Sequence, residues 1–233
     1  MAEPGDVKLY MFTGSNAVRS AELMLRHKGI AYEEVILRRG AHRTQLPALG
    51  FSGKTVPALD INGHRVQRTR EISRALDLVK PQPRLFPADT ADRAAVEAAE
   101  RWGEGLQDAA RRLFYCAMLR TRAAPIDLLA ARVHGATDAA GRRELAELPA
   151  RLDQIDAWLE SGVLGSEDLT AADFQIAPNI AWLLCFDDIA PFLQHRPAAD
   201  HAIRVSGENP RQIPRVFTDE WLTPLRMHDI NAA

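Results

Sequence analysis

The chain has 233 residues, a length that suits one large domain or two small ones. Its apolar content of 46% and charged content of 26% are typical of a globular protein. The formal net charge is −2, and acidic and basic residues are interleaved along the chain. We therefore expect neither nucleic acid nor an anionic membrane as a partner.

The cysteines and the first residues indicate a compartment. Cys116 and Cys185 lie far apart in apolar runs and form no CxxC pair or zinc-binding spacing, so we expect buried free thiols in a reducing compartment. The opening MAEPGDVKLY lacks the basic and apolar regions of a signal peptide, and no apolar run reaches membrane-spanning length. The sequence predicts a cytoplasmic protein.

The first eighty residues alternate between strand-like and helix-like patterns. In chain order they predict a strand, a helix, a second strand parallel to the first, a loop, a β-hairpin and a helix, over residues 7–12, 17–29, 30–37, 38–52, 55–68 and 69–80. Asn62-Gly63, between the two hairpin strands, is typical of a tight turn. This order predicts an α/β domain.

A proline-rich segment separates this region from a helical second half. Residues 80–90 predict an interdomain linker. After it no strand pattern is found, and helices are predicted over residues 91–120, 127–134, 141–161 and 169–186, with a loop over 196–216. We expect the first of these helices to be slackened near Gly103 and Gly105. Thr170 and Asp173 have the spacing of a capping box at the start of the last one.

Val56-Pro57 stands at a predicted strand, where a proline loses a ladder hydrogen bond. Two explanations remain open. A trans proline could begin an edge strand, or the Val56–Pro57 bond could be cis, which for an X–Pro bond costs only about 0.5–1 kcal/mol. A cis bond would turn the N–H and C=O groups of Val56 outward, where they could pair with an extended, peptide-like ligand.

Three motifs, in this order, resemble the glutathione S-transferase family: LYMFTGSNAVRSAELML in the first strand–helix unit, GKTVPAL around the proline, and LTAADF at the capping box. The resemblance spans nearly the whole chain and is more specific for fold than for activity. It implies a thioredoxin-like domain over residues 6–82 that binds glutathione, and an all-α helical-bundle domain over 90–233 that lines the second-substrate pocket. It also implies a cis Pro57 and pairing of the Val56 main chain with glutathione.

By this resemblance Ser15, just before the first helix, holds the position of a catalytic hydroxyl. A hydroxyl at the positive end of a helix stabilises a thiolate and lowers the pKa of a thiol from its usual value near ~8.5. Asn16 is an alternative donor and Thr13 a weaker one, although all three residue types are also ordinary N-caps. Ala17 stands where cysteine-type members carry their thiol, so we expect no mixed disulfide on this loop.

Basic residues are candidates for binding the carboxylates of glutathione. Counted back from Val56, His42 and Arg43 fall where plant-type phi members carry a His-Lys pair that contacts the glycyl carboxylate. A solvated pair in a loop is the alternative interpretation. Lys54 is a second candidate for the same contact.

Arg68-Thr69 departs from the Glu/Gln-Ser pair that the family usually carries. Thr69 can replace the serine, which together with a helix N-terminus binds the γ-glutamyl α-carboxylate. Arg68 cannot replace the acid or amide, because a guanidinium has only donors and repels the ammonium group. Glu71, one helical turn further, could reach back. Otherwise the site prefers a ligand that is more anionic than glutathione or that lacks its free amine.

In the helical half, Arg111, Arg112 and Tyr115 fall where the family lines the second-substrate pocket. Two arginines suit an anionic or electron-poor substrate, and the alternative is a solvated arginine pair beside core aromatic residues. Asp173 is expected to be structural. The tryptophans, Trp182 among them, are expected at core or interdomain positions.

The first hypothesis is a glutathione S-transferase-like enzyme that adds the glutathione thiolate to a small apolar electrophile. By resemblance it is a homodimer, and no metal or redox cofactor is implied. The rival hypothesis, favoured by Arg68, is a non-catalytic or glutathione-independent member that binds an anionic metabolite or acts as a scaffold. An interaction module of the translation machinery uses the same fold, but such modules are usually attached to further domains, so we rank it last.

Overall fold

The computed structural model describes residues 5–121 and 124–232. Residues 1–4, 122–123 and 233 lie outside the described part of the chain. They fall in the opening segment MAEPGDVKLY and in the predicted domain 90–233. Among the helices that are described, none is both long enough and apolar enough to span a bilayer.

The amino-terminal region forms a four-stranded sheet with the strand order β2-β1-β3-β4. Its elements are β1 (Val7–Met11), α1 (Asn16–His27), β2 (Glu33–Ile36), α2 (His42–Ala48), β3 (Ala58–Ile61), β4 (His64–Gln67) and α3 (Thr69–Val79). Strand β1 pairs in parallel with β2 and antiparallel with β3, and β3 pairs antiparallel with β4. The predicted thioredoxin-like domain is confirmed.

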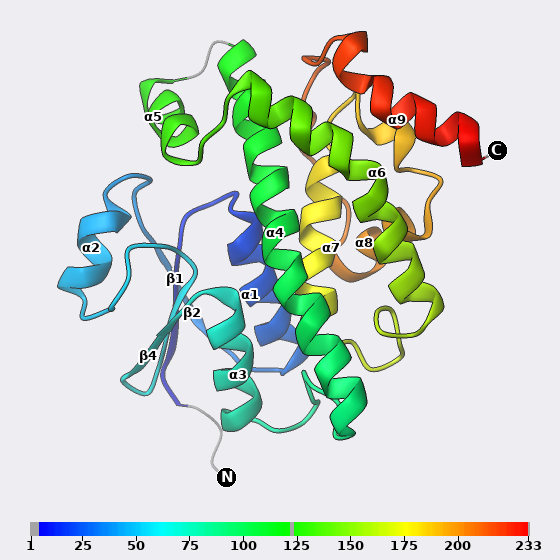
Figure 1. Ribbon diagram of the computed structural model, residues 1–233. Coiled ribbons are helices and arrows are strands. Elements are labelled where there is room, and N and C mark those ends of the chain that lie inside the picture. The colour runs from blue at the N-terminus through cyan, green and yellow to red at the C-terminus, as the bar shows by residue number, and fades with distance from the viewer. Residues whose placement is uncertain (1–4, 122–123, 233) are drawn as a thin grey trace.

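Helices cover both faces of this sheet. Because successive side chains of a strand point to opposite faces, Leu9 of β1 is buried toward α1 and α3, while Tyr10 is buried toward α2. The Tyr10 ring meets Phe51 edge-on at 5.1 Å between ring centroids. Figure 1 shows α2 on the outer side of the sheet, with α1 and α3 between the sheet and the long helix of the second domain.

Two local features of this domain differ in how well the sequence predicted them. The hairpin turn is confirmed, because Asn62 and Gly63 both have positive φ angles, of 52° and 85°. The loop expected over residues 38–52 is partly wrong, since α2 lies within it. Only Leu46 of this short helix is buried, so its sequence shows no apolar periodicity.

The carboxy-terminal region is helical, as predicted. Its elements are α4 (Thr90–Arg120), α5 (Pro125–Val133), α6 (Asp138–Glu160), α7 (Ala171–Leu183), the short 3-10 helix η1 (Ala190–Phe192), α8 (Pro197–Ser206) and α9 (Asp219–Ala232). Helix α4 runs through the middle of the molecule beside α7 (Figure 1), and α7 is buried along its whole length. Cys116 and Cys185 are buried and free, as expected, and burial raises the pKa of each thiol to about 11.

Two expectations for the helical domain are wrong. Helix α4 is unbroken at Gly103, where a Cβ atom would lie 2.7 Å from Cγ of Gln175, so this glycine lets α4 pack closely on α7. The loop expected over residues 196–216 contains α8. Pro197 occupies the first turn of α8 and Gly207, with a φ of 74°, ends it, so these two residues mark the limits of a helix.

The capping box at the start of α7 is confirmed. Asp173 Oδ2 accepts hydrogen bonds from the N–H and the hydroxyl of Thr170, at 2.7 and 2.8 Å, and Oδ1 accepts from the N–H of Gly165 at 2.7 Å. Burial opposes ionisation of this carboxyl, but the His201 ring, with Nε2 3.2 Å from Oδ1, and the main-chain hydrogen bonds hold the pKa of Asp173 below its usual range. Asp173 is therefore structural.

Candidate active site

A cleft of about 170 Å³ lies between the sheet domain and helices α4, α5 and α7. Seven of the residues singled out from the sequence line it: Ser15, Asn16, His42, Arg43, Val56, Arg111 and Tyr115. Among the other described residues that the sequence singled out, the following lie outside its lining: Lys54, Pro57, Arg68, Thr69 and Arg112. The fold thus gathers segments from both domains around one space.

Ser15 is the N-cap of α1 and also faces this cleft. Its Oγ accepts a hydrogen bond from the N–H of Val18 at 3.4 Å. A hydroxyl that accepts one hydrogen bond keeps its own hydrogen, so Ser15 can cap the helix and still donate to a ligand. The N-cap interpretation and the donor interpretation are therefore compatible.

Asn16 is buried and held from two sides. Its Oδ1 accepts from the N–H of Ala17 at 3.1 Å, and its Nδ2 donates to Oδ1 of Asn179 on α7. Asn179 is fixed in turn by donating to the C=O of Gln175 at 2.7 Å. Asn16 thus joins α1 to α7, and the second N–H of its amide has no partner among the residues that the structure describes.

The loop that carries Val56 is fixed by a side chain that the sequence did not single out. Gln67 Oε1 accepts from the N–H of Gly53 at 2.5 Å, and Gln67 Nε2 donates to the C=O of Thr55 at 3.1 Å. The Val56–Pro57 bond is cis. In the described part of the chain, neither main-chain group of Val56 has a hydrogen-bond partner. Both are therefore available to a ligand.

Arg68 and Thr69 lie next to this loop. The N–H of Arg68 donates to the C=O of Pro57 at 3.3 Å, and Thr69 begins α3 and is buried. Arg68 has a φ of 67°, a region sparsely populated by residues other than glycine. Its side chain is 73% exposed, and its Nη1 lies 3.9 Å from a carboxylate oxygen of Glu71. Glu71 therefore lies beside Arg68.

His42 and Arg43 line the cleft from α2. Nδ1 of His42 accepts from the N–H of Gly40 at 3.1 Å. Burial lowers the pKa of His42, and the nearby Arg43 and Arg39 lower it further, against a hydrogen bond with the Arg38 main chain that raises it. His42 is thus a neutral donor at neutral pH, and Arg43 supplies the positive charge at this position.

Arg39, which the sequence did not single out, bridges the two domains across the cleft. Its Nη1 lies 2.5 Å from Oδ1 of Asp127 on α5, and its Nη2 lies 3.4 Å from the Tyr115 hydroxyl. Its guanidinium also lies 5.9 Å from the centroid of the Phe12 ring. This contact holds the loop after β2 against the helical domain.

The helical wall contains one predicted residue that is misplaced. Arg111 and Tyr115 line the cleft, but the structure corrects the position of Arg112. Arg112 Nε donates to Oε1 of the buried Glu144 on α6 at 2.7 Å. Neighbouring positions of a helix are separated by about 100°, and here Arg111 is directed to the cleft while Arg112 is directed to α6.

His134, at the end of α5, also lines the cleft and was not predicted. Its ring stacks on Tyr115, with 5.3 Å between centroids and 6° between planes. Burial, and then the charge of Arg111, lower the pKa of His134 to about 4, although Asp108 acts in the opposite direction. The imidazole is therefore neutral at neutral pH.

We expect the free energy of unfolding to fall between about pH 7 and about pH 4.5, in part because of His134. The pKa of His134 is about 4 in the folded protein and near ~6.5 in the unfolded chain. The neutral imidazole therefore contributes fully to the free energy of unfolding above the unfolded pKa, and this contribution is lost as the pH falls toward the folded pKa. Allowing for its partial exposure, we expect a loss of about 1–2 kcal/mol. Urea unfolding at both pH values should show a smaller loss for His134→Gln than for the natural protein. Equal losses would contradict this assignment.

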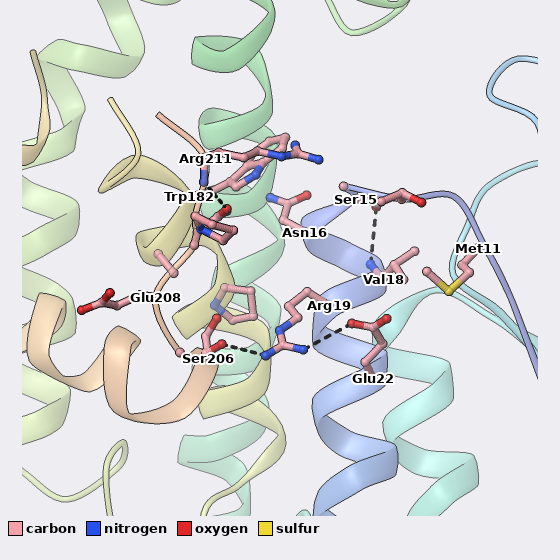
Figure 2. Close-up of a pocket in the computed structure, with 17 residues that line it drawn as sticks. Met11, Ser15, Asn16, Val18, Arg19, Glu22, Trp182, Ser206, Glu208 and Arg211 are labelled. Atoms are coloured by element: carbon pink, nitrogen blue, oxygen red, sulfur yellow. Dashed lines mark hydrogen bonds and ion pairs between the residues drawn. The ribbon is translucent and has the colours of Figure 1, made fainter. Parts of the chain in front are cut away.

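A second hollow, of about 400 Å³, lies on the other side of residues 14–16. Figure 2 shows Arg211 reaching from the segment after α8 across Asn16, and Arg19 held by Glu22 and by the C=O of Ser206. A Cβ atom on Gly14 would lie 2.9 Å from Cζ of Arg211, so a larger residue here would displace this guanidinium. Because the hollow contains neither Val56 nor His42, the cleft is the candidate site.

The fold and the cleft together define a protein with a thioredoxin-like domain, an all-helical domain and a cleft between them. Residues 9–84 match the family model described as "Glutathione S-transferase, N-terminal domain". The amino-terminal domain therefore belongs to the glutathione S-transferase family, and the chain as a whole has the glutathione S-transferase fold.

Solved structures show the same fold over nearly the full length of the chain. A glutathione S-transferase from Rhodospirillum rubrum F11 is 21% identical, with a TM-score of 0.64 over 94% of this chain and 99% of that one. One from Methylobacterium radiotolerans, in complex with glutathione sulfonate, is 20% identical, with a TM-score of 0.65 over 92% and 98%. A Tau class enzyme from mango, Mangifera indica, is 18% identical, with a TM-score of 0.62 over 97% and 99%. No protein with a curated description matches the sequence.

Proposed function

We propose that this protein is a glutathione S-transferase that adds the glutathione thiolate to a small electrophile with an apolar body. The observation that carries the proposal is the shared cleft. The hydroxyl of Ser15, at the N-terminus of α1, and the unpaired main-chain groups of Val56 line the same space. The methylobacterial relative of the same fold was solved in complex with glutathione sulfonate, which supports the choice of ligand.

In the proposed complex the peptide-like backbone of glutathione pairs with Val56, as a strand pairs with a sheet edge. Its sulfur lies at Ser15, where the hydroxyl donates to it and the helix dipole of α1 favours negative charge. The thiolate then attacks an electrophile held against the helical wall. Positioning and electrostatic stabilisation carry the reaction, and the serine is not a nucleophile. On the resemblance alone, we also propose a cytoplasmic homodimer.

A glutathione-independent ligand-binding protein is the second candidate, because Arg68 stands where the ammonium group of glutathione would lie. The structure gives Arg68 an acidic neighbour, Glu71, which could receive the ammonium if the exposed guanidinium swings away. Under the transferase proposal the natural protein therefore binds glutathione, although less tightly than a protein with an acid at this position.

We expect the natural protein to be retained on immobilised glutathione, and Arg68→Glu to bind roughly fivefold more tightly. An exposed ion pair contributes up to about 1 kcal/mol, and the substitution exchanges repulsion for attraction. Arg101→Glu, an equal charge change at an exposed position of α4, is the matched control and should behave like the natural protein. If only Arg68→Glu is retained, the second candidate is correct for the natural protein.

A further inference from the structure

We propose that the electrophile accepted by this cleft carries a carboxylate on its apolar body, and that the carboxylate binds to Arg111 and Tyr115 on the helical wall. The inference rests on the proposed function and names its second substrate by chemical class.

The lining of the cleft has a strong charge bias. None of its lining residues, among those that the structure describes, is acidic, whereas three arginines and two histidines are present: Arg39, Arg43, Arg111, His42 and His134. Arg39 is already paired with the buried Asp127. Two of the three guanidinium groups can therefore meet an anionic ligand.

These two groups belong to different halves of the cleft. Arg43 lies on α2, beside the position proposed for glutathione. Arg111 lies on α4, and its carboxylate partner Asp108, at 2.8 Å, is 53% exposed. An i,i+3 pair at the surface is weak, so Arg111 can turn to a second ligand at little cost.

A second donor stands beside Arg111. The Tyr115 hydroxyl accepts from Nη2 of Arg39 at 3.4 Å, and no acceptor for its own hydrogen is found among the described residues. The residue is buried and its ring is held flat against His134. His134 is subject to the charges of Arg111, Arg43 and Arg39, so positive charge converges on this part of the wall.

Next to these donors, α5 presents an apolar strip to the cleft. Ile126, Leu129, Ala130 and Val133 follow the i, i+3, i+4, i+7 spacing of one helix face and all line the cleft. A ligand that fills the space thus meets carbon along α5 and positive charge at α4. An aromatic or unsaturated carboxylate has a matching apolar body and anionic end. A charge-assisted hydrogen bond to the carboxylate favours this ligand over a neutral analogue.

The test compares 4-chloro-3-nitrobenzoate with 4-chloro-3-nitrobenzamide. In each reaction the glutathione sulfur forms a C–S bond, chloride leaves with the electron pair of the C–Cl bond, and the thiol proton goes to solvent. After division by the uncatalysed rates, we expect kcat/KM to favour the benzoate by roughly 10- to 100-fold.

Arg111→Gln should bring this ratio close to one. Arg132→Gln removes the same charge from the exposed side of α5, outside the cleft, and should leave the ratio unchanged. A natural ratio near one, or an equal fall for both substrates in Arg111→Gln, would overturn the proposal.

A binding measurement separates this inference from the proposed function. Calorimetry with the unreactive 3-nitrobenzoate and 3-nitrobenzamide, without thiol, should show tighter binding of the benzoate and loss of that preference in Arg111→Gln. If neither chlorinated substrate reacts but this preference is found, the transferase function fails and the carboxylate site stands. If neither experiment shows that the protein prefers the benzoate to the benzamide, the carboxylate site is wrong.

Discussion

Replacing Ser15 with alanine is expected to lower kcat/KM for the reaction of glutathione with 4-chloro-3-nitrobenzoate about 100-fold, the effect of removing one well-placed hydrogen-bond donor. Without the hydroxyl, the pKa of the bound thiol should rise, so the pH profile of kcat/KM should shift to higher pH. Steady-state kinetics over a range of pH values measure both effects.

The controls separate the loss of the donor from the loss of the N-cap. Removing a serine N-cap destabilises a helix by about 1 kcal/mol, which urea unfolding detects independently. Ser15→Thr keeps both the hydroxyl and the cap and should retain most of the activity. Thr13→Ala, at a residue that lines the second hollow and not the cleft, should have little effect. If Ser15→Ala stays within about threefold of the natural enzyme, the thiolate donor lies elsewhere.

Replacing Lys28 with methionine is expected to destabilise the protein by about 3–5 kcal/mol, because it leaves one member of a buried ion pair without its partner. Lys28, just after α1, has a fully buried side chain. Its Nζ lies 2.5 Å from Oδ1 of Asp77 on α3, and donates to the C=O of Lys80 at 2.8 Å and to that of Pro83. It therefore ties α1 to the end of α3 and to the linker between the domains.

Urea unfolding measures this loss directly. Lys28→Met combined with Asp77→Asn should regain part of it, because the second change removes the unpaired charge. Lys8→Met, at a partly exposed pair with Asp6 and Glu33, is the matched control and should change the free energy of unfolding by less than about 1 kcal/mol. A loss below about 1 kcal/mol for Lys28→Met would show that the pair does not hold α1 to α3 and the linker.

The fold was predictable from the sequence because its elements are marked by local patterns. Asn62-Gly63 fixes the hairpin and Gly29 follows the end of α1, while Thr170 with Asp173 marks the start of α7. The elements α2 and α8 were missed for a local reason as well. A short helix with one buried residue has no periodicity, and the proline and glycine that bound α8 resemble a loop.

Part of the candidate site was predictable because Ser15 and Val56 lie in contiguous motifs, and His42 was located by its distance in sequence before Val56; all three residues line the cleft. The contacts that fix it were not. Arg39 meets Asp127 across 88 positions of sequence, and nothing local to either residue indicates the pair. Arg112 was misplaced because it is adjacent to Arg111 on α4. A resemblance in sequence does not show which of two adjacent helical residues faces the cleft.

A crystal structure of the protein with glutathione tests the central claim most directly. We predict that the glutathione sulfur lies within hydrogen-bond distance of the Ser15 hydroxyl, with the main chain of its cysteinyl residue paired to Val56. A cleft that stays empty at saturating glutathione, or a glutathione bound instead in the hollow beside Arg211, would contradict it.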